Sequence, residues 1–324
     1  VTGLGEEDTK AELGTIKNNI LNLSSEGLLD LGTTSIKDMV SADGTVKIGD
    51  AANLNSDELK NATGVGKKTD VTGGVSGGFK DIKVTDADAT SDQVIVKDTL
   101  QLAGSTDGGV LAQDKNNNAL ALQVKDGKAL TLGDSAKANQ GMVGKVTLGD
   151  SSGGGTLNAV GNGDASFTTG DIVATGDDKG EVSVSGATLN SGKIGDSAKK
   201  VETVSANSGV VNAASINTGT LAASNGLITA EKDITVTNAV DGTTGSLTNS
   251  LIHSATGDVT LTAGASNASG AIVADTGDIK TTDADITVAD GAELKVVSGK
   301  AINVGAGDIT ATNVQAGTTI TAAD

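Results

Sequence analysis

Two Gly-x-Ser-x-Gly strings are the segments of the chain that come closest to a catalytic motif, at Gly74–Gly78 and Gly149–Gly153. In such a motif the serine stands on a sharp turn between a strand and a helix, and a histidine from elsewhere activates it. Neither string has that context. With 46 glycines in 324 residues, about one match of this kind is expected by chance. We therefore assign no catalytic residue.

The single histidine does not fit a metal or catalytic site, and one lysine-containing string does not fit a phosphate-binding loop. His253 lies in the strand pattern 251–254, and a lone histidine cannot assemble a multi-histidine metal site. The string Gly64–Thr69 resembles a phosphate loop, but Asn61 replaces the required first glycine and Lys68 replaces the Ser or Thr after the lysine. No cofactor-binding residue is predicted.

One segment imitates the start of a calcium-binding EF-hand loop, with Asp114, Asn116 and Asn118 at the first three ligand positions. The imitation fails further on, because Ala119 replaces the invariant glycine and Lys125 replaces the bidentate glutamate. The glycine-rich nonapeptide of calcium β-rolls is also absent. No metal ligand is predicted, and calcium binding at acidic turns is left open with no residue set assigned.

The charge and composition exclude several classes of partner. The chain carries 41 acidic and 23 basic residues, a net charge of −18, and every basic residue is lysine. Without arginine and with an acidic surface, nucleic acid is not an expected partner. No apolar run approaches the 18 residues of a membrane-spanning helix, so no transmembrane segment is expected. A chain that starts at Val1 without methionine favours a processed, exported protein.

The near absence of aromatic residues constrains the core. The sequence has no Trp, no Tyr and no Cys, and only Phe79 and Phe167 are aromatic. Such a chain must bury Val, Ile, Leu, Ala and Thr, which suits a thin, extended core. Carbohydrate-active β-helix enzymes, the remaining enzymatic alternative, need aromatic or basic sugar platforms that this composition does not supply. We predict that the chain is not an enzyme.

The first 75 residues are predicted to form a partly helical head that acts as a cap or an assembly region. Leu13, Ile16, Ile20 and Leu23 fall on one face of a helix with 3.6 residues per turn. Acidic residues at 6–8 suit the start of that helix, and residues 56–62 favour a second, shorter one.

Residues 76–150 are predicted to form a β-rich section that includes a hairpin. Alternating apolar residues in 119–125 and 128–132 flank Asp126-Gly127. Asp-Gly between two such runs is the strongest short-range signal for a β-hairpin.

Residues 151–324 have a repetitive texture that predicts a β-solenoid. Short strands of the form apolar–Thr–apolar recur, and several follow Gly-Asp, as at Gly170-Asp171, Gly257-Asp258, Gly277-Asp278 and Gly307-Asp308. Strands of three to five residues are stable only when each pairs with a neighbour on both sides. Glycine is expected to supply positive-φ corners, and asparagine and aspartate tolerate them. A β-sandwich is the competing fold, but it favours longer strands and more aromatics.

A second recurrent element is Ile or Leu followed by Gly-Asp, at 48–50, 132–134, 148–150 and 194–196. With the Gly-, Asn- and Thr-rich segments around it, this element resembles the passenger regions of autotransporter-type surface antigens and S-layer-like proteins of Gram-negative bacteria. The resemblance spans about residues 120–324 and is one of texture. It implies display on the outside of a bacterial cell, with self-association or adhesion.

These observations lead to one functional hypothesis and two alternatives. We expect an extracellular structural protein whose last strands, up to Asp324, pair head to tail with the first strands of another copy, giving a cell-surface fibre or lattice. The first alternative is an adhesin passenger that binds a host or neighbouring cell. The second and more remote is a carbohydrate-active enzyme.

Overall fold

In a computed structural model of residues 1–324, the described part of the chain consists of β-strands joined by turns, bends and short irregular segments. The structure describes residues 13–17, 20–23, 45–48, 68–71, 81–84, 88–90, 93–96, 100–114, 116–238, 247–248, 250–262, 265–268, 271–281, 286–288, 293–296, 301–303, 309–310, 313–316 and 319–321. The chain divides by its contacts into a first unit, Val1–Gly170, and a second unit, Asp171–Asp324.

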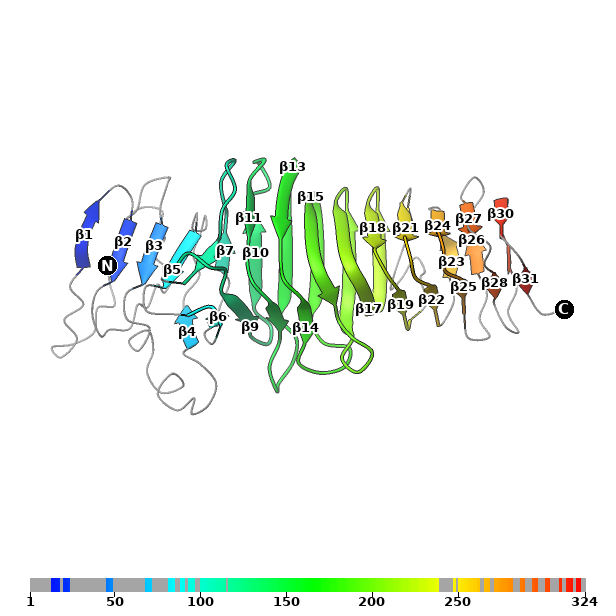
Figure 1. The fold of residues 1–324 in the computed structure, drawn as a ribbon, viewed down its shortest axis with the longest axis horizontal. Helices are drawn as coiled ribbons and strands as arrows, with labels where there is room; N and C mark the ends of the chain where they lie inside the picture. Colours follow the sequence, from blue (N-terminus) through cyan, green and yellow to red (C-terminus); the bar gives the residue numbers. More distant parts are fainter. Residues whose placement is uncertain are drawn as a thin grey trace. The chain divides into compact units, whose positions relative to one another are not determined.

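The first unit stacks its strands in three columns (Figure 1). The first column contains β1 (Leu13–Lys17), β2 (Ile20–Leu23), β3 (Thr45–Ile48), β5 (Asp81–Val84) and β8 (Ala112–Gln113). The second contains β4 (Lys68–Val71), β6 (Gln93–Val96), β9 (Ala121–Val124) and β12 (Val146–Leu148). The third contains β7 (Leu100–Leu102), β10 (Ala129–Gly133) and the first part of β13 (Thr156–Thr168), whose last residues pair with β11 (Gln140–Met142).

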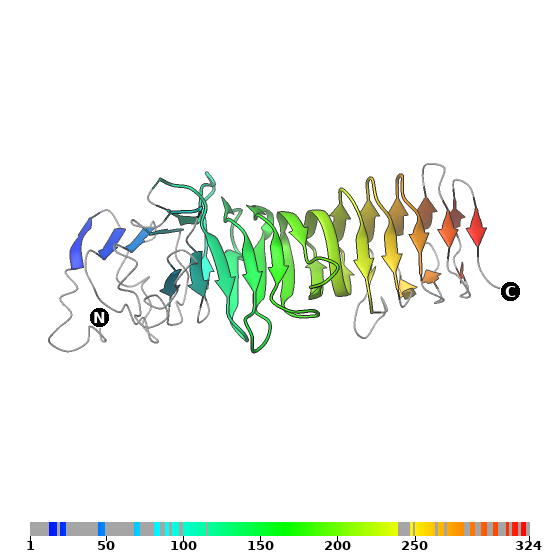
Figure 2. The same cartoon turned by 60° about the horizontal axis from the view of Figure 1, so that its bottom comes forward.

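The second unit repeats the same arrangement, and its strands lie side by side in Figures 1 and 2. Column A runs through β15 (Glu181–Ile194), β17 (Val210–Ser224), β18 (Leu227–Ala230), β21 (Leu251–Ser254), β24 (Ala271–Ala274), β27 (Glu293–Val296) and β30 (Asn313–Gln315). Column B runs from β14 (Ile172–Ala174) through parts of β15 and β17 to β19 (Ile234–Val236), β22 (Val259–Leu261), β25 (Ile279–Lys280), β28 (Ile302–Asn303) and β31 (Ile320–Thr321). Column C runs from part of β15 through β16 (Val201–Asn207) and part of β17 to β20 (Leu247–Thr248). A separate three-stranded sheet follows, with β23 (Ala265–Ala268), β26 (Ile286–Val288) and β29 (Ile309–Thr310).

One strand from each column makes one repeat, which we call a rung. In column A, Leu227 pairs with Leu251, and Leu251 pairs with Ala271, so successive rungs lie 24 and 20 residues apart in the sequence. The described pairs between rungs are parallel throughout the second unit. Strands of two to four residues hold because each is bonded to a rung before it and a rung after it.

The core of the second unit is a set of aliphatic columns in register. In column B each partner of a β-branched residue is another β-branched residue, in the order Ile172, Ile194, Ile216, Ile234, Val259, Ile279, Ile302 and Ile320. The first seven are fully buried, whereas Ile320 in the last described rung is 52% exposed. Each rung therefore buries the apolar residues of its neighbours, and Ile320, after which the structure describes no further rung, is open to solvent.

The one aromatic side chain of the described core fills the space left by a glycine. Phe167 is fully buried, and a Cβ on Gly133 would lie 2.6 Å from its ring. Gly133 also has a positive φ of 97°, which side chains rarely adopt. The largest residue of the core thus lies where its neighbour has no side chain at all.

The predicted helix in the head is wrong where the structure describes the chain. Residues Leu13–Lys17 and Ile20–Leu23 form the antiparallel strands β1 and β2, and β2 pairs in parallel with β3. The same four apolar residues can form one face of a helix or the apolar positions of two short strands. The pairing of β2 with β3 favours the strands. The second predicted helix, at 56–62, lies outside the described residues.

The predicted hairpin at Asp126-Gly127 is also wrong. Its two strands, β9 and β10, do not pair with each other but lie in different columns, where each has parallel partners. Asp-Gly forms a turn with Gly127 at a φ of 62°, as expected, but the chain leaves this turn toward the next column. Parallel pairing is therefore not confined to the residues after 151.

Mutations at the inward and outward positions of one strand are expected to lower the free energy of unfolding by very different amounts. We expect Ile234→Ala to lower the free energy of unfolding by about 2–5 kcal/mol, because it opens a cavity in the filled column B. Thr235→Ala, at the half-buried outward position next to it, is the control and should cost under about 1 kcal/mol. Urea denaturation followed by circular dichroism measures both, and equal losses would contradict the register.

Candidate functional site

The Gly-Asp repeats form contacts between successive rungs. The Asp233 carboxylate accepts the backbone N–H of Asp258 at 2.9 Å, and the Asp258 carboxylate accepts that of Asp278 at 2.8 Å. Asp278 does the same for the N–H of Ala301 at 2.9 Å, and Asp171 for that of Lys193 at 2.9 Å. Each of these aspartates precedes a buried Ile or Val of column B. We call this contact the rung clasp.

Three of the four clasps contain a glycine just before the donating residue, and space rather than a positive φ requires it there, whereas Lys300 precedes Ala301 in the fourth. A Cβ on Gly192 or Gly257 would lie 2.1 or 2.3 Å from the carboxylate oxygen of the preceding rung, at Asp171 or Asp233. A Cβ on Gly277 would lie 1.9 Å from the carbonyl oxygen of Gly257. The sequence prediction of positive-φ corners is therefore wrong for these three glycines, which are absent from the residues with positive φ.

The clasps place like charges near one another, and one lysine offsets the repulsion. Lys280 lies with its Nζ 2.6 Å from Asp258 Oδ2. The hydrogen bond with Asp258, together with the charges of Asp258, Asp278 and Asp233, raises the pKa of Lys280, although partial burial opposes the shift. The carboxylates are thus occupied by backbone N–H groups and by an ammonium group.

The second motif, Ile or Leu followed by Gly-Asp, forms a turn at the end of a strand instead of a contact between rungs. Its glycines do have positive φ, with values of 97° at Gly133, 95° at Gly149 and 65° at Gly195. The aspartate that follows then caps the loop, since Asp150 accepts the N–H of Ser152 and Asp196 that of Ala198, both at 2.8 Å. This motif ends a strand and starts an Asx-type turn, so two similar sequence patterns have separate structural roles.

Asp114, the first residue of the segment that resembles an EF-hand loop, is buried, and its carboxylate accepts hydrogen bonds mainly from backbone N–H groups. It accepts the N–H of Asn116 at 2.7 Å, of Asn118 at 2.8 Å and of Ala89 at 3.1 Å, and also the Asn118 side-chain amide at 3.0 Å. Burial alone would raise the pKa of Asp114, but these hydrogen bonds together hold it below its ordinary value of 3.8. The carboxylate thus organises a turn.

The structure brings none of the other sequence candidates together. His253 is half-buried in β21, as the strand pattern predicts, and its Nε2 lies 2.9 Å from Asp275 Oδ2. In the string Gly149–Gly153, Asp150 forms the turn and its Oδ2 lies 3.6 Å from Lys125 Nζ. Gly74–Gly78 and residues 64–67 lie outside the described part of the chain.

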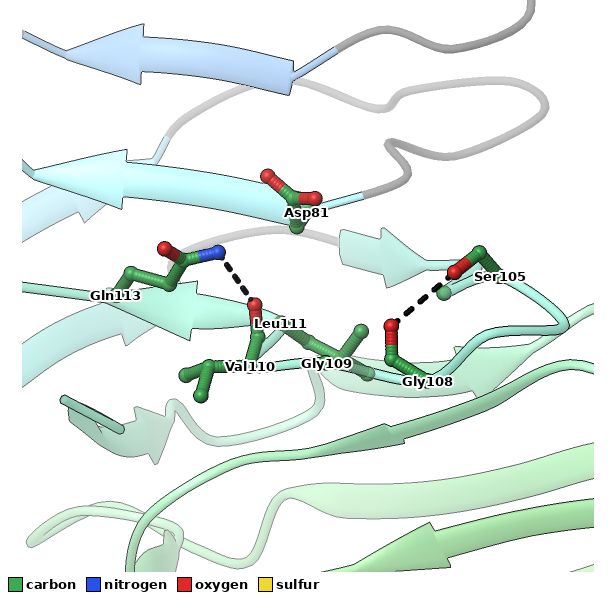
Figure 3. Close-up of a pocket in the computed structure, with 8 residues that line it drawn as sticks. Asp81, Ser105, Gly108, Gly109, Val110, Leu111 and Gln113 are labelled. Atoms are coloured by element: carbon green, nitrogen blue, oxygen red, sulfur yellow. Dashed lines mark hydrogen bonds between the residues drawn. The ribbon is translucent and has the colours of Figure 1, made fainter. Parts of the chain in front are cut away.

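The first unit contains a small polar pocket that the sequence did not indicate, and we call it the Asp81 pocket (Figure 3). It has a volume of about 190 Å³ and is lined by Asp81, Gly104, Ser105, Gly108, Gly109, Val110, Leu111 and Gln113. Asp81 comes from β5, and Figure 3 shows it facing the segment that leads into β8. Three glycines with positive φ, at 104, 108 and 109, shape that segment.

A second hollow of about 340 Å³ shares residues 108–110 and extends to Gln140, Gly141, Met142, Ser166 and Thr168. Met142 is 42% exposed there. Both hollows arise where the segment 104–111 departs from regular pairing and makes isolated bridges to β11. The Gly-Gly pair at 108–109 is the sequence signal of this irregularity, but composition alone does not distinguish it from the other glycine pairs.

The close packing at the rung clasp predicts that a Gly→Ala substitution strongly lowers the free energy of unfolding at some glycines and hardly changes it at others. We expect Gly277→Ala to lower the unfolding free energy by more than about 2 kcal/mol, because the backbone of the preceding rung must move. Gly176→Ala is the matched control, since its Cβ would meet only the flexible side chain of Lys179 at 3.2 Å. Thermal unfolding measures both, and a tolerated alanine at 277 would refute the steric role.

The buried Asp114 predicts a loss of stability in acid. Because its pKa is lowered on folding, its contribution is complete above its ordinary pKa of 3.8 and disappears as the pH falls through the folded value. Asp114→Asn should cost about 1–3 kcal/mol at pH 7. The difference from the parent should shrink below about pH 3.8. Urea titrations at several pH values test this, with the exposed Asp107→Asn as control, and a pH-independent difference would contradict it.

Comparisons with known proteins give no relative. No protein-family model, no curated protein and no solved structure matches the chain. Among the described residues no helix has the length and apolarity needed to cross a membrane. Any function for this chain must therefore be argued from its own geometry.

Proposed function

We propose that the chain is a β-solenoid that serves as a structural protein outside a bacterial cell, where copies pair end to end into a fibre or lattice. The observation that carries this proposal is the in-register stacking of rungs in the second unit, where column B repeats one β-branched residue per rung. Such stacking grows in one dimension, because every rung offers the next the same backbone edge and the same apolar surface.

The last described rung is the surface at which this growth continues. Its strands β29, β30 and β31 each pair, among the described strands, only with the rung before. Ile320 is 52% exposed, whereas its column partner Ile302 is fully buried. A further rung supplied by another copy would bury Ile320, which contributes roughly 1–2 kcal/mol, and would pair the open backbone groups.

The partner strands proposed for this surface lie at the other end of the chain. There β1 pairs, within the described part of the chain, with β2 alone, and the proposal assigns its other edge to a strand of another copy. Contact between two different ends does not close on itself, so it yields a fibre or an open lattice rather than a ring or a dimer.

The charge of the chain gives this association a defined salt dependence. At a net charge of −18, copies repel one another at low ionic strength, and salt screens this repulsion. An acidic surface that keeps separate copies soluble while the apolar rung ends pair suits a protein that assembles after export, and the resemblance to bacterial surface proteins agrees with it.

Self-association is tested on the 324-residue chain by analytical ultracentrifugation and electron microscopy. We expect polymers that lengthen as salt rises from 10 to 150 mM, since the Debye length falls from about 30 to 8 Å. Ile320→Lys should shift assembly to at least tenfold higher protein concentration, because a charge replaces the apolar end of column B. Ser135→Lys, with the same charge change at an exposed loop, should assemble like the parent.

Dispersed monomers at all concentrations and salt conditions would refute assembly and favour the adhesin alternative, a monomeric stalk with a receptor. Equal effects of the two lysine substitutions would show that association follows net charge rather than the last rung.

A further inference from the structure

The Asp81 pocket is lined by several hydrogen-bond acceptors, and the two side-chain donors on its wall each already make one bond within that wall. The Ser105 hydroxyl donates to the carbonyl oxygen of Gly108 at 3.1 Å, and the Gln113 side-chain amide donates to that of Val110 at 2.7 Å. Figure 3 shows both bonds along the wall of the pocket opposite Asp81. A hydroxyl has a single proton, so Ser105 can offer a ligand only its oxygen lone pairs.

Three backbone N–H groups of the same wall also make hydrogen bonds within the protein. The N–H groups of Ser105, Gly108 and Leu111 donate to the carbonyl oxygens of Gln140, Ser105 and Met142, at 3.3, 3.1 and 2.8 Å. The carbonyl oxygens of Gly108 and Val110 each accept one bond from a side chain and keep a second lone pair. The wall therefore offers a ligand the hydroxyl oxygen of Ser105 and the carbonyl oxygens of Gly108 and Val110 as acceptors, while the Gln113 amide keeps a second N–H.

The Asp81 carboxylate, on the opposite side, is the one ionisable side chain among the described residues that line the pocket. A carboxylate has about four lone-pair sites, so it can bind a ligand alongside the partners it already has. One negative charge facing neutral oxygen atoms complements a monovalent cation whose surface consists of donors.

We propose that the Asp81 pocket binds a primary ammonium group, with Asp81 as its counter-ion and Ser105 and the carbonyl oxygens of Gly108 and Val110 as further acceptors. An ammonium group carries three donors and no acceptor, which matches this lining. The volume of about 190 Å³ exceeds that of a bare ion and accommodates an ammonium with a short alkyl chain. Calcium is the weaker fit, since its sites usually contain several carboxylates.

The ammonium group can come from a small alkylamine or from a lysine side chain of a peptide. Isothermal titration calorimetry at pH 7 uses the 324-residue chain with butylammonium chloride as the first probe and N-acetyl-lysine amide as the second. Saturable binding of both assigns the pocket to lysine side chains as well as free amines. Binding of butylammonium alone assigns it to small amines. Butan-1-ol, which has the same chain without charge, should not bind.

Variants locate the binding within the pocket. Asp81→Asn should weaken butylammonium binding at least tenfold, whereas Glu181→Gln, which removes an exposed carboxylate in the second unit, should leave it unchanged. Ser105→Ala should weaken it about threefold and serves as the test if Asp81→Asn does not fold, which circular dichroism shows.

Three results would overturn the proposal: equal binding of butan-1-ol, binding unaffected by both pocket variants, or calcium chloride binding that outcompetes butylammonium at the same residues. None of these results bears on assembly through the last rung. The ammonium site and the structural role are therefore tested separately.

Discussion

Most of this structure depends on backbone pairing between rungs that lie about 4.8 Å apart, the spacing of neighbouring strands. Strands as short as Ile279–Lys280 have no stability of their own and exist because a rung on each side bonds to them. At that spacing, equivalent residues of successive rungs stack directly on one another. The side chain at each position must therefore pack against the side chains at the equivalent positions of the rungs before and after it.

That requirement explains which residues the chain uses and where. Inward positions repeat Ile, Val, Leu and Ala, since a narrow interior filled at every rung leaves no room for large side chains. Phe167 is accommodated only because Gly133 lies beside it. At the corners the same closeness removes side chains altogether, as at Gly277, and brings an aspartate of one rung within reach of the next rung's backbone. Composition, core and clasps are thus consequences of one spacing.

The sequence was sufficient to predict β-structure in the repetitive part and the inward–outward alternation of strands such as Ile234–Val236. It was misleading where a local signal has two solutions. Asp126-Gly127 forms the expected turn, but whether the chain returns beside its own strand or enters the next column is decided by distant partners such as β6 and β13. The helical spacing of Leu13 to Leu23 failed for the same reason, because the pairing with β3 is not encoded locally.

The candidate sites were predictable only in part. The place of His253 in a strand was predictable from the alternating pattern, and it lies half-buried in β21. The Asp81 pocket could not be found that way, because it combines β5 with a glycine-bent segment more than twenty residues later. Its acceptor-rich character depends on which N–H groups are already bonded, and no residue type reveals that.

The register between rungs also governs how such a chain can change in length. Ala271 donates its backbone N–H to Ser250 at 2.8 Å, and Leu251, twenty residues before it, occupies the equivalent place in the preceding rung. Removal or duplication of this whole segment would leave each remaining residue with neighbours of the same kind. An insertion of a single residue within a strand would instead turn every later side chain of that strand to the opposite face. Gene variants of this chain are therefore expected to differ by whole rungs, and its length is free to evolve while its cross-section is not.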